Sequence, residues 1–249
     1  MLKYIIAIIL IIPLLIVMTP LLLIMAYKPK WFSIKFRYAY VRFLIRWVAF
    51  SLRVKHIVDG EENIPSKGRF FITPNHQSFF DALSLICVFK RPITFVAKKE
   101  TLKMPYIGLI IKVIGGFFLD RTNIRESLKM MKDLEKFMLD NPEVGVIIFP
   151  EGTRTRDPLL AIDEFKGGSY KVAYKTMTPV TPTFMTGTPR ILTLKWYWIH
   201  KVNIRFGKTL SYDEYKDIDS NELAKICHDF SVENLEELHK INDCRKKTA

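Results

Sequence analysis

A long apolar run near the start of the chain limits what the rest of the molecule can become. Residues Tyr4–Tyr27 are almost wholly apolar, and Lys28-Pro29-Lys30 closes the run. Its length is roughly that of a helix that crosses a bilayer. The run is too long for the core of a cleaved signal peptide, and no small-residue cleavage site follows it. Because Pro13 and Pro20 can kink the helix, the sequence predicts either a membrane span or a re-entrant, half-buried helix.

The next stretch, Trp31–Val54, combines a basic stripe with apolar and aromatic faces. At helical spacing, the stripe consists of Lys35, Arg42, Arg46 and Arg53. No Asp or Glu occurs before Asp59. This pattern favours a helix in the membrane interface, where each basic residue near anionic headgroups contributes about 1 kcal/mol. The alternative is an ordinary helix that packs on the domain with its basic edge in water.

The 249 residues suit one domain with an appendage, divided here into membrane-anchoring helices over residues 1–55 and an α/β domain over residues 56–249. The formal net charge of +13 indicates an anionic partner. Much of that charge is assigned to membrane lipids, which weakens a nucleic-acid hypothesis and predicts a cell-membrane protein with its domain on the cytoplasmic face. Cys87, Cys227 and Cys244 lack metal or redox spacing and are interpreted as reduced thiols.

From Val58 onward, apolar runs alternate with helical patterns. The expected strands cover residues 69–73, 93–97, 116–119, 144–149, 180–185 and 202–206. The expected helices begin near Ser78 and then cover residues 106–114, 124–139, 169–175 and 219–241. This alternation predicts an α/β fold with a mostly parallel sheet flanked by helices. The carboxyl ends of parallel strands lie on one edge, where such folds bind ligands.

A first polar segment follows the strand that stops at Pro74. His76 lies in the turn after the strand, and Ser78-x-x-Asp81 is a capping-box-like start of a helix. From the first helical turn, Asp81 can reach back to one imidazole nitrogen, fix the tautomer and leave the other nitrogen as a base. The alternative is that Asp81 only caps the helix and His76 is a loop histidine.

Two further expected strands end in polar residues. One runs through Gly115-Gly116-Phe117-Phe118-Leu119 into Asp120-Arg121, and the other ends in Phe149-Pro150-Glu151-Gly152-Thr153-Arg154-Thr155. A guanidinium with hydroxyls and turn amides suits a phosphate monoester. A plain ion pair of Arg121 with Asp120 or another acid is the competing interpretation. Lys98 and Lys99 follow a third strand and either add charge to the same edge or form a solvated pair.

In this order and at these intervals, the three segments resemble the motifs of the glycerolipid acyltransferase family, and most of all its bacterial 1-acylglycerol-3-phosphate acyltransferases. The resemblance covers about Val58–Phe206. It implies that His76 is a general base oriented by Asp81. It also implies that a glycerol phosphate is bound by a further set of residues: Arg121, Glu151, Gly152, Thr153 and Arg154, with Lys98 or Lys99 as weaker members.

The resemblance implies acyl transfer without a metal, a cofactor or an acyl-enzyme. The expected donor is a thioester of coenzyme A or acyl carrier protein, and the expected acceptor is the sn-2 hydroxyl of lysophosphatidic acid, which gives phosphatidic acid. One alternative is acylation of glycerol-3-phosphate or another lysophospholipid. Another is a non-catalytic membrane lipid-binding protein, which would not need a base with an orienting carboxylate. A membrane-tethered nucleic-acid binder is the third.

Overall fold

A computed structural model describes residues 2–155, 161–192 and 199–247, with side chains described from 5 to 155, 161 to 192 and 199 to 240. Its centre is a seven-stranded sheet in the order β1-β7-β6-β2-β5-β3-β4. The strands are β1 (Val54–Asp59), β2 (Phe71–Pro74), β3 (Ile93–Lys98), β4 (Phe117–Leu119), β5 (Gly145–Ile147), β6 (Val180–Thr186) and β7 (His200–Phe206). All neighbouring strands are parallel except β6 and β7. The predicted α/β fold with a mostly parallel sheet is therefore confirmed.

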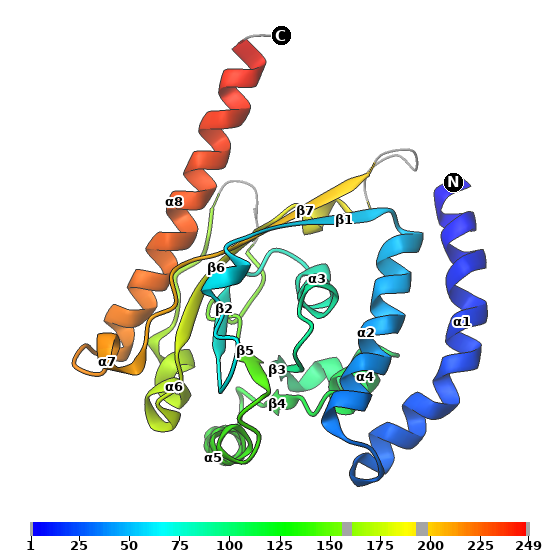
Figure 1. The fold of residues 1–249 in the computed structure, drawn as a ribbon, viewed down its shortest axis with the longest axis horizontal. Coiled ribbons are helices and arrows are strands. Elements are labelled where there is room, and N and C mark those ends of the chain that lie inside the picture. Colours follow the sequence, from blue (N-terminus) through cyan, green and yellow to red (C-terminus); the bar gives the residue numbers. More distant parts are fainter. Residues whose placement is uncertain (1, 156–160, 193–198, 248–249) are drawn as a thin grey trace.

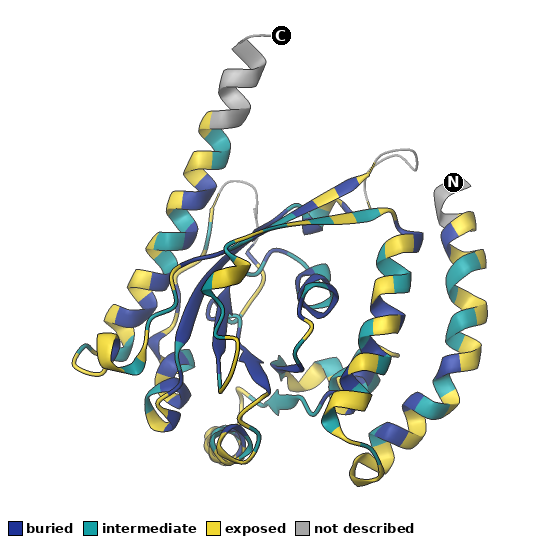
Figure 2. Ribbon diagram, viewed as in Figure 1, coloured by how far each residue is buried: buried dark blue, intermediate teal, exposed yellow. Residues whose placement is uncertain are grey.

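Helices cover both faces of this sheet (Figure 1). They are α1 (Leu2–Tyr27), α2 (Ile34–Ser51), α3 (Phe80–Val88), α4 (Ile107–Val113), α5 (Ile124–Asp140), α6 (Lys171–Thr176), α7 (Tyr212–Tyr215) and α8 (Ser220–Lys247). One apolar core joins α1–α4 to one face of the sheet, and a second core joins α5, α6 and α8 to the other. Strands β2, β5 and β6 lie buried between these layers (Figure 2). Continuous apolar strands are typical of a sheet covered on both faces.

The sequence missed β1. Its residues were divided between the interfacial helix, which was expected to reach Val54, and the start of the domain, whereas the structure pairs Val54–Asp59 in parallel with β7. Along β1, partly buried and exposed residues alternate, with Lys55 and Asp59 on the exposed side. An edge strand with charged residues on its open face lacks the apolar run that identified the central strands. The short helix α7 was also missed.

Helix α2 has both a packed face and an exposed one. Tyr38, Val41, Leu44 and Ile45 are buried against the domain, whereas Phe36, Phe43 and Phe50 form an exposed stripe. Within the predicted basic stripe, Arg42 turns inward and donates to the Cys87 carbonyl oxygen at 3.1 Å. The remaining members, Lys35, Arg46 and Arg53, are exposed. The packed-helix alternative is therefore correct for one face of α2, and the aromatic and basic faces remain open to a membrane.

Candidate active site

The centre of the site is a turn at the carboxyl end of β2. After Pro74 the chain leaves the sheet, and α3 begins at Phe80, so His76 and Asp81 lie on either side of the turn. The imidazole Nδ1 of His76 lies 2.8 Å from Asp81 Oδ2. The predicted pairing of the two side chains is therefore present. The Nε2 atom has no hydrogen-bond partner among the described residues, which leaves it free to meet a substrate.

Asp81 is fully buried, and its carboxylate is held by several donors. Besides the imidazole, Oδ2 accepts from the backbone amides of Gln77 at 2.6 Å and Ser78 at 2.8 Å. The other oxygen accepts from the Thr188 hydroxyl. The amides lie where a helix N-terminus favours negative charge. The N-terminal residue before α3, Phe79, has no side-chain cap, so Asp81 does not cap the helix. Its carboxylate contacts His76 and holds the turn that leads into α3.

The loop after β5 holds the backbone of His76. Glu151 Oε1 accepts from the His76 amide at 2.6 Å, and the Thr155 amide donates to the His76 carbonyl at 3.0 Å. The Thr155 hydroxyl donates to the other Glu151 oxygen. Burial raises the pKa of the Glu151 carboxyl, although the hydrogen bonds from Thr155 and His76 oppose this effect. Because both oxygens are engaged within the chain, Glu151 acts on the position of His76, and its direct contact with an acceptor stays a prediction.

Two more contacts fix the turn. The Asn75 side chain donates to the Met185 carbonyl at 3.0 Å and accepts from the Met185 amide at 2.7 Å, which joins the turn to the end of β6. The His76 ring stacks on Phe149 with ring centroids 4.1 Å apart. The sequence analysis assigned no role to Asn75, whose partner lies 110 positions away in the chain, on the strand next to β2. Thr188 was likewise missed, because no local pattern links it to Asp81.

The arginines lie beside this turn. A β-carbon on Gly152 would be 2.9 Å from Arg121 Nη2, so the Arg121 guanidinium lies over the glycine. Gly152 has φ +75°, a conformation that a glycine adopts readily. Arg121, Thr153 and Arg154 are exposed. Neither arginine forms an ion pair with a described residue, so the plain ion pair between Arg121 and Asp120 is absent and both cations remain available for an anion.

The lysines have other partners. Lys99 Nζ lies 2.9 Å from Asp120 Oδ2 and 3.0 Å from Glu126 Oε2. The hydrogen bonds that Lys99 donates to these two carboxylates raise its pKa. Lys98 pairs with Glu100 at 3.1 Å. The structure therefore brings Arg121, Gly152 and Arg154 to the edge that carries His76, while both lysines are engaged in ion pairs. Whether either lysine binds an acceptor stays a prediction.

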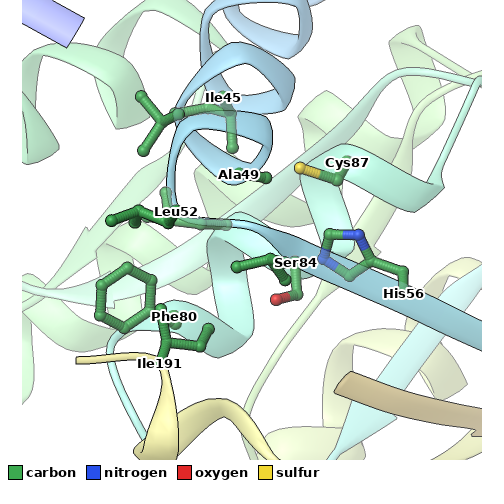
Figure 3. A pocket seen from close by; sticks show the side chains of 11 residues that line it. Ile45, Ala49, Leu52, His56, Phe80, Ser84, Cys87 and Ile191 are labelled. Carbon is green, nitrogen blue, oxygen red and sulfur yellow. The ribbon is translucent and has the colours of Figure 1, made fainter. Parts of the chain in front are cut away.

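An apolar pocket lies between α2 and α3 (Figure 3). Phe80, the neighbour of Asp81, and Ile191 lie at one end, and His56, Ser84 and Cys87 lie at the other. Burial lowers the pKa of His56 to about 4 and raises the pKa of Cys87 to about 12, so both groups are neutral at physiological pH. In the described part of the chain, no group of three or more His, Cys, Asp or Glu residues is placed to hold a metal ion.

Comparisons with known proteins agree with these motifs. The chain is 36% identical over 135 residues to a 1-acyl-sn-glycerol-3-phosphate acyltransferase of Borreliella burgdorferi, a match that covers 54% of this chain and 52% of that protein. It is 32% identical over 206 residues to a probable 1-acyl-sn-glycerol-3-phosphate acyltransferase of Mycoplasma genitalium, covering 77% of this chain and 74% of that protein. The two matches thus span about half of the Borreliella protein and about three quarters of the Mycoplasma protein.

The fold is also similar to a solved structure. The crystal structure of the 1-acyl-sn-glycerophosphate (LPA) acyltransferase PlsC from Thermotoga maritima aligns with a TM-score of 0.68 and 24% sequence identity, over 95% of this chain and 93% of that one. The family model described as Acyltransferase matches residues 55–186, which is more than half of the chain. This chain therefore belongs to the acyltransferase family that its three motifs predicted.

Proposed function

We propose that this protein transfers a fatty acyl group from a thioester to the sn-2 hydroxyl of lysophosphatidic acid, giving phosphatidic acid. The observation that carries the proposal is the pairing of His76 Nδ1 with Asp81 Oδ2 at 2.8 Å, beside two arginines that have no ion-pair partner among the described residues. The relatives named as 1-acyl-sn-glycerol-3-phosphate acyltransferases support the same acceptor.

In the proposed reaction, His76 acts as a general base. An alcohol is a poor nucleophile at neutral pH, and a positioned base contributes about 10²–10⁴-fold to the rate. As Nε2 takes the hydroxyl proton, the alkoxide oxygen attacks the thioester carbonyl and the imidazolium is stabilised by Asp81. The tetrahedral intermediate then expels the thiolate, which takes the proton from Nε2. The new ester and the free thiol leave without an acyl-enzyme.

In this proposal, the arginines position the acceptor by binding its phosphate. Lysophosphatidic acid carries a phosphomonoester, for which an arginine offers a planar pair of donors. The Arg121 guanidinium lies over Gly152, and Gly152 is two residues before Arg154 in the chain. Both cations therefore lie at the edge that carries the base. A phosphate held there leaves the glycerol hydroxyl within reach of Nε2.

The packing of α1 favours a helix that lies along the membrane surface. Trp47 Nε1 donates to the Leu10 carbonyl at 2.9 Å, and the Tyr40 hydroxyl donates to the Met18 carbonyl at 3.2 Å, so α2 runs back beside α1. Leu10 lies about 25 Å along the helix from Tyr27. An upright span would carry the arginines of α2 into hydrocarbon, at about 2.5–3.5 kcal/mol or more for each.

We therefore place α1 and the exposed aromatic stripe of α2 in the interface of the cytoplasmic leaflet. Neutralisation by Arg46→Gln or Arg53→Gln, at two exposed positions, should weaken binding to anionic vesicles about fivefold for each arginine, since each contributes about 1 kcal/mol. Binding to neutral vesicles should change little. Vesicle flotation measures both. An equal loss on the two kinds of vesicle would show that these arginines serve packing.

The central experiment measures thioester consumption with lysophosphatidic acid for the wild type and His76→Ala. We expect the variant to lose activity by orders of magnitude while it stays folded and bound to membranes. Near-normal turnover by the variant would exclude His76 as the base. Running the assay with acyl-CoA and with acyl carrier protein thioesters identifies the donor, and mass spectrometry of the product separates lysophosphatidic acid from glycerol-3-phosphate or another lysophospholipid.

A further inference from the structure

A short turn beside α1 exposes apolar side chains that acyl transfer does not use. This segment, residues 99–106, contains the 3-10 helix η3 (Lys99–Lys103) and leads into α4, and we call it the η3 turn. Leu102, Met104 and Tyr106 are 37%, 44% and 37% exposed. Lys103 is exposed among them and forms no ion pair with a described residue. Apolar side chains that gather beside a free cation suit the surface of an anionic membrane.

The η3 turn lies directly against the apolar helix. The Tyr106 and Thr19 hydroxyls form a hydrogen bond of 3.2 Å, and the Lys112 ammonium lies 5.7 Å from the centroid of the Tyr27 ring. Helix α1 exposes Ile16 and Val17, close in the chain to Thr19, by 67% and 74%. The apolar side chains of the η3 turn are therefore continuous with the apolar surface that α1 presents to lipid.

The backbone of the η3 turn closes on itself. The Met104 amide donates to Thr101 at 3.1 Å, and the Gly108 amide donates to Met104 at 3.1 Å. A β-carbon on Gly108 would lie 2.7 Å from the Leu102 carbonyl oxygen, so glycine permits this close packing. Irregular backbone tolerates a lipid environment only when its polar groups are paired. Paired amides and exposed apolar side chains together fit contact with lipid better than with water.

The same turn is tied to the strand end that carries Arg121. Lys99 Nζ lies 2.9 Å from Asp120 Oδ2 and 3.0 Å from Glu126 Oε2, so it joins the turn to β4 and to the first turn of α5. Asp120 immediately precedes Arg121. A shift of the η3 turn relative to the membrane would therefore move the arginine that is proposed to bind the acceptor.

We propose that the η3 turn is a second lipid-contact element, which rests in the headgroup region of an anionic bilayer and sets the depth of Arg121 for a lipid acceptor that enters from the membrane. The occupant is a lipid surface, because the turn continues the apolar face of α1 and offers a free lysine. The effect on the acceptor rests on the proposed function, whereas the lipid contact does not depend on it.

The first test measures depth with the full chain. Met104→Cys, in a Cys244→Ser background, is labelled with an environment-sensitive fluorophore and bound to vesicles of phosphatidylglycerol and phosphatidylcholine that contain a doxyl-labelled lipid. Cys87 and Cys227 are buried, which keeps the label at the new position. The matched control is Ile226→Cys, at a position where the native side chain is 42% exposed. Its helix, α8, lies at the other end of the molecule from α1 (Figure 1).

We expect the label at Met104→Cys to be quenched by the doxyl lipid and shielded from aqueous iodide, and the label at Ile226→Cys to show the reverse. Equal iodide quenching at the two positions would overturn the lipid contact. A label at Met104→Cys that is shielded from both quenchers would show that the turn is covered by protein instead, which also overturns the proposal.

The second test measures kinetics. The double variant Leu102→Asp/Met104→Asp should raise the KM for a long-chain acceptor in vesicles about tenfold, with an unchanged KM for a water-soluble short-chain acceptor and an unchanged Tm. Ile226→Asp should change neither KM. Equal shifts for both acceptors would overturn the role in acceptor entry. If the wild type transfers no acyl group while the label at Met104→Cys is quenched by lipid, the proposed function fails and the lipid contact stands.

Discussion

The first turn of α3 and the loop after β5 each bring a buried carboxylate to His76, and the two carboxylates contact different parts of that residue. Asp81 is 0% exposed and contacts the imidazole ring, while Glu151 is 2% exposed and contacts the backbone amide. A carboxylate on the ring stabilises the charge that forms when the base takes a proton. A carboxylate on the amide sets only where the ring lies. Proximity to a histidine therefore does not by itself define the role of an acidic residue.

The largest effect that separates the two carboxylates should come from Asp81→Asn. The amide oxygen can still accept from the Gln77 and Ser78 amides, and the Thr188 hydroxyl can rotate to accept from the new amide nitrogen. The variant therefore loses charge more than shape. We expect kcat to fall by about 10²–10⁴-fold, nearly as far as in His76→Ala, because the imidazolium is no longer stabilised. Steady-state kinetics with a parallel Tm measurement checks this, and a normal kcat would leave Asp81 with only a structural role in the turn before α3.

A smaller effect is expected at Arg154, which belongs to the loop after β5 but points to solvent. If it binds the phosphomonoester, Arg154→Ala should raise the KM for the acceptor roughly ten- to a hundredfold, since a charged hydrogen bond is worth about 1.5–3 kcal/mol. The KM for the donor should move little. Arg154→Lys should recover only part of the loss, because an ammonium cannot make the bidentate contact.

The control for Arg154 is an acceptor that lacks the phosphate, on which Arg154→Ala should have no effect. Impairment of donor and acceptor alike, or a loss of Tm alone, would assign Arg154 to the structure of the loop. The phosphate-binding residues would then have to be sought at Arg121, or at Lys98 and Lys99, which form ion pairs with carboxylates.

The sequence predicted the contact between Asp81 and His76 but missed the contact between Glu151 and His76. Strong apolar runs identified the central strands, and the spacing of His76 and Asp81 across a helix start predicted their contact. Glu151 was grouped with the arginines by the family resemblance and by its place beside Arg154 in the chain. In the structure it accepts from the His76 amide, in the turn after another strand and 75 positions away, and no local pattern reports such a contact.

Other omissions have the same origin. The bonds of Asn75 to Met185 and of Asp81 to Thr188 join segments that only the folded sheet brings together. Lys99 was expected at the rim of the site, but the acidic residues Asp120 and Glu126 come within ion-pair distance once β3 and β4 are paired. Residue type and strand position indicated the edge of the sheet, whereas the partner of each polar group depended on tertiary packing.

The smallest expected effect, and the sharpest contrast with Asp81, comes from Glu151→Gln. The amide oxygen can still accept from the His76 amide, and the Thr155 hydroxyl can rotate toward the new nitrogen, so kcat should fall less than tenfold. The Asp163 amide, 3.4 Å from Glu151 Oε2, loses its acceptor. We expect a loss of about 0.5–1.5 kcal/mol in the free energy of unfolding, as for one hydrogen bond.

The pH dependence of this loss follows from burial, which raises the pKa of the Glu151 carboxyl above its ordinary value of 4.5. Between 4.5 and the raised pKa, the folded state keeps a proton that the unfolded state releases, so the contribution of Glu151 to stability falls as pH rises through this window. Glu151→Gln has no such ionisation. The stability difference between wild type and variant should therefore be largest below the window and smallest above it, as measured by urea unfolding in mild detergent. A difference that grows with pH would show that the donors around Glu151 stabilise its ionised form more than burial opposes it.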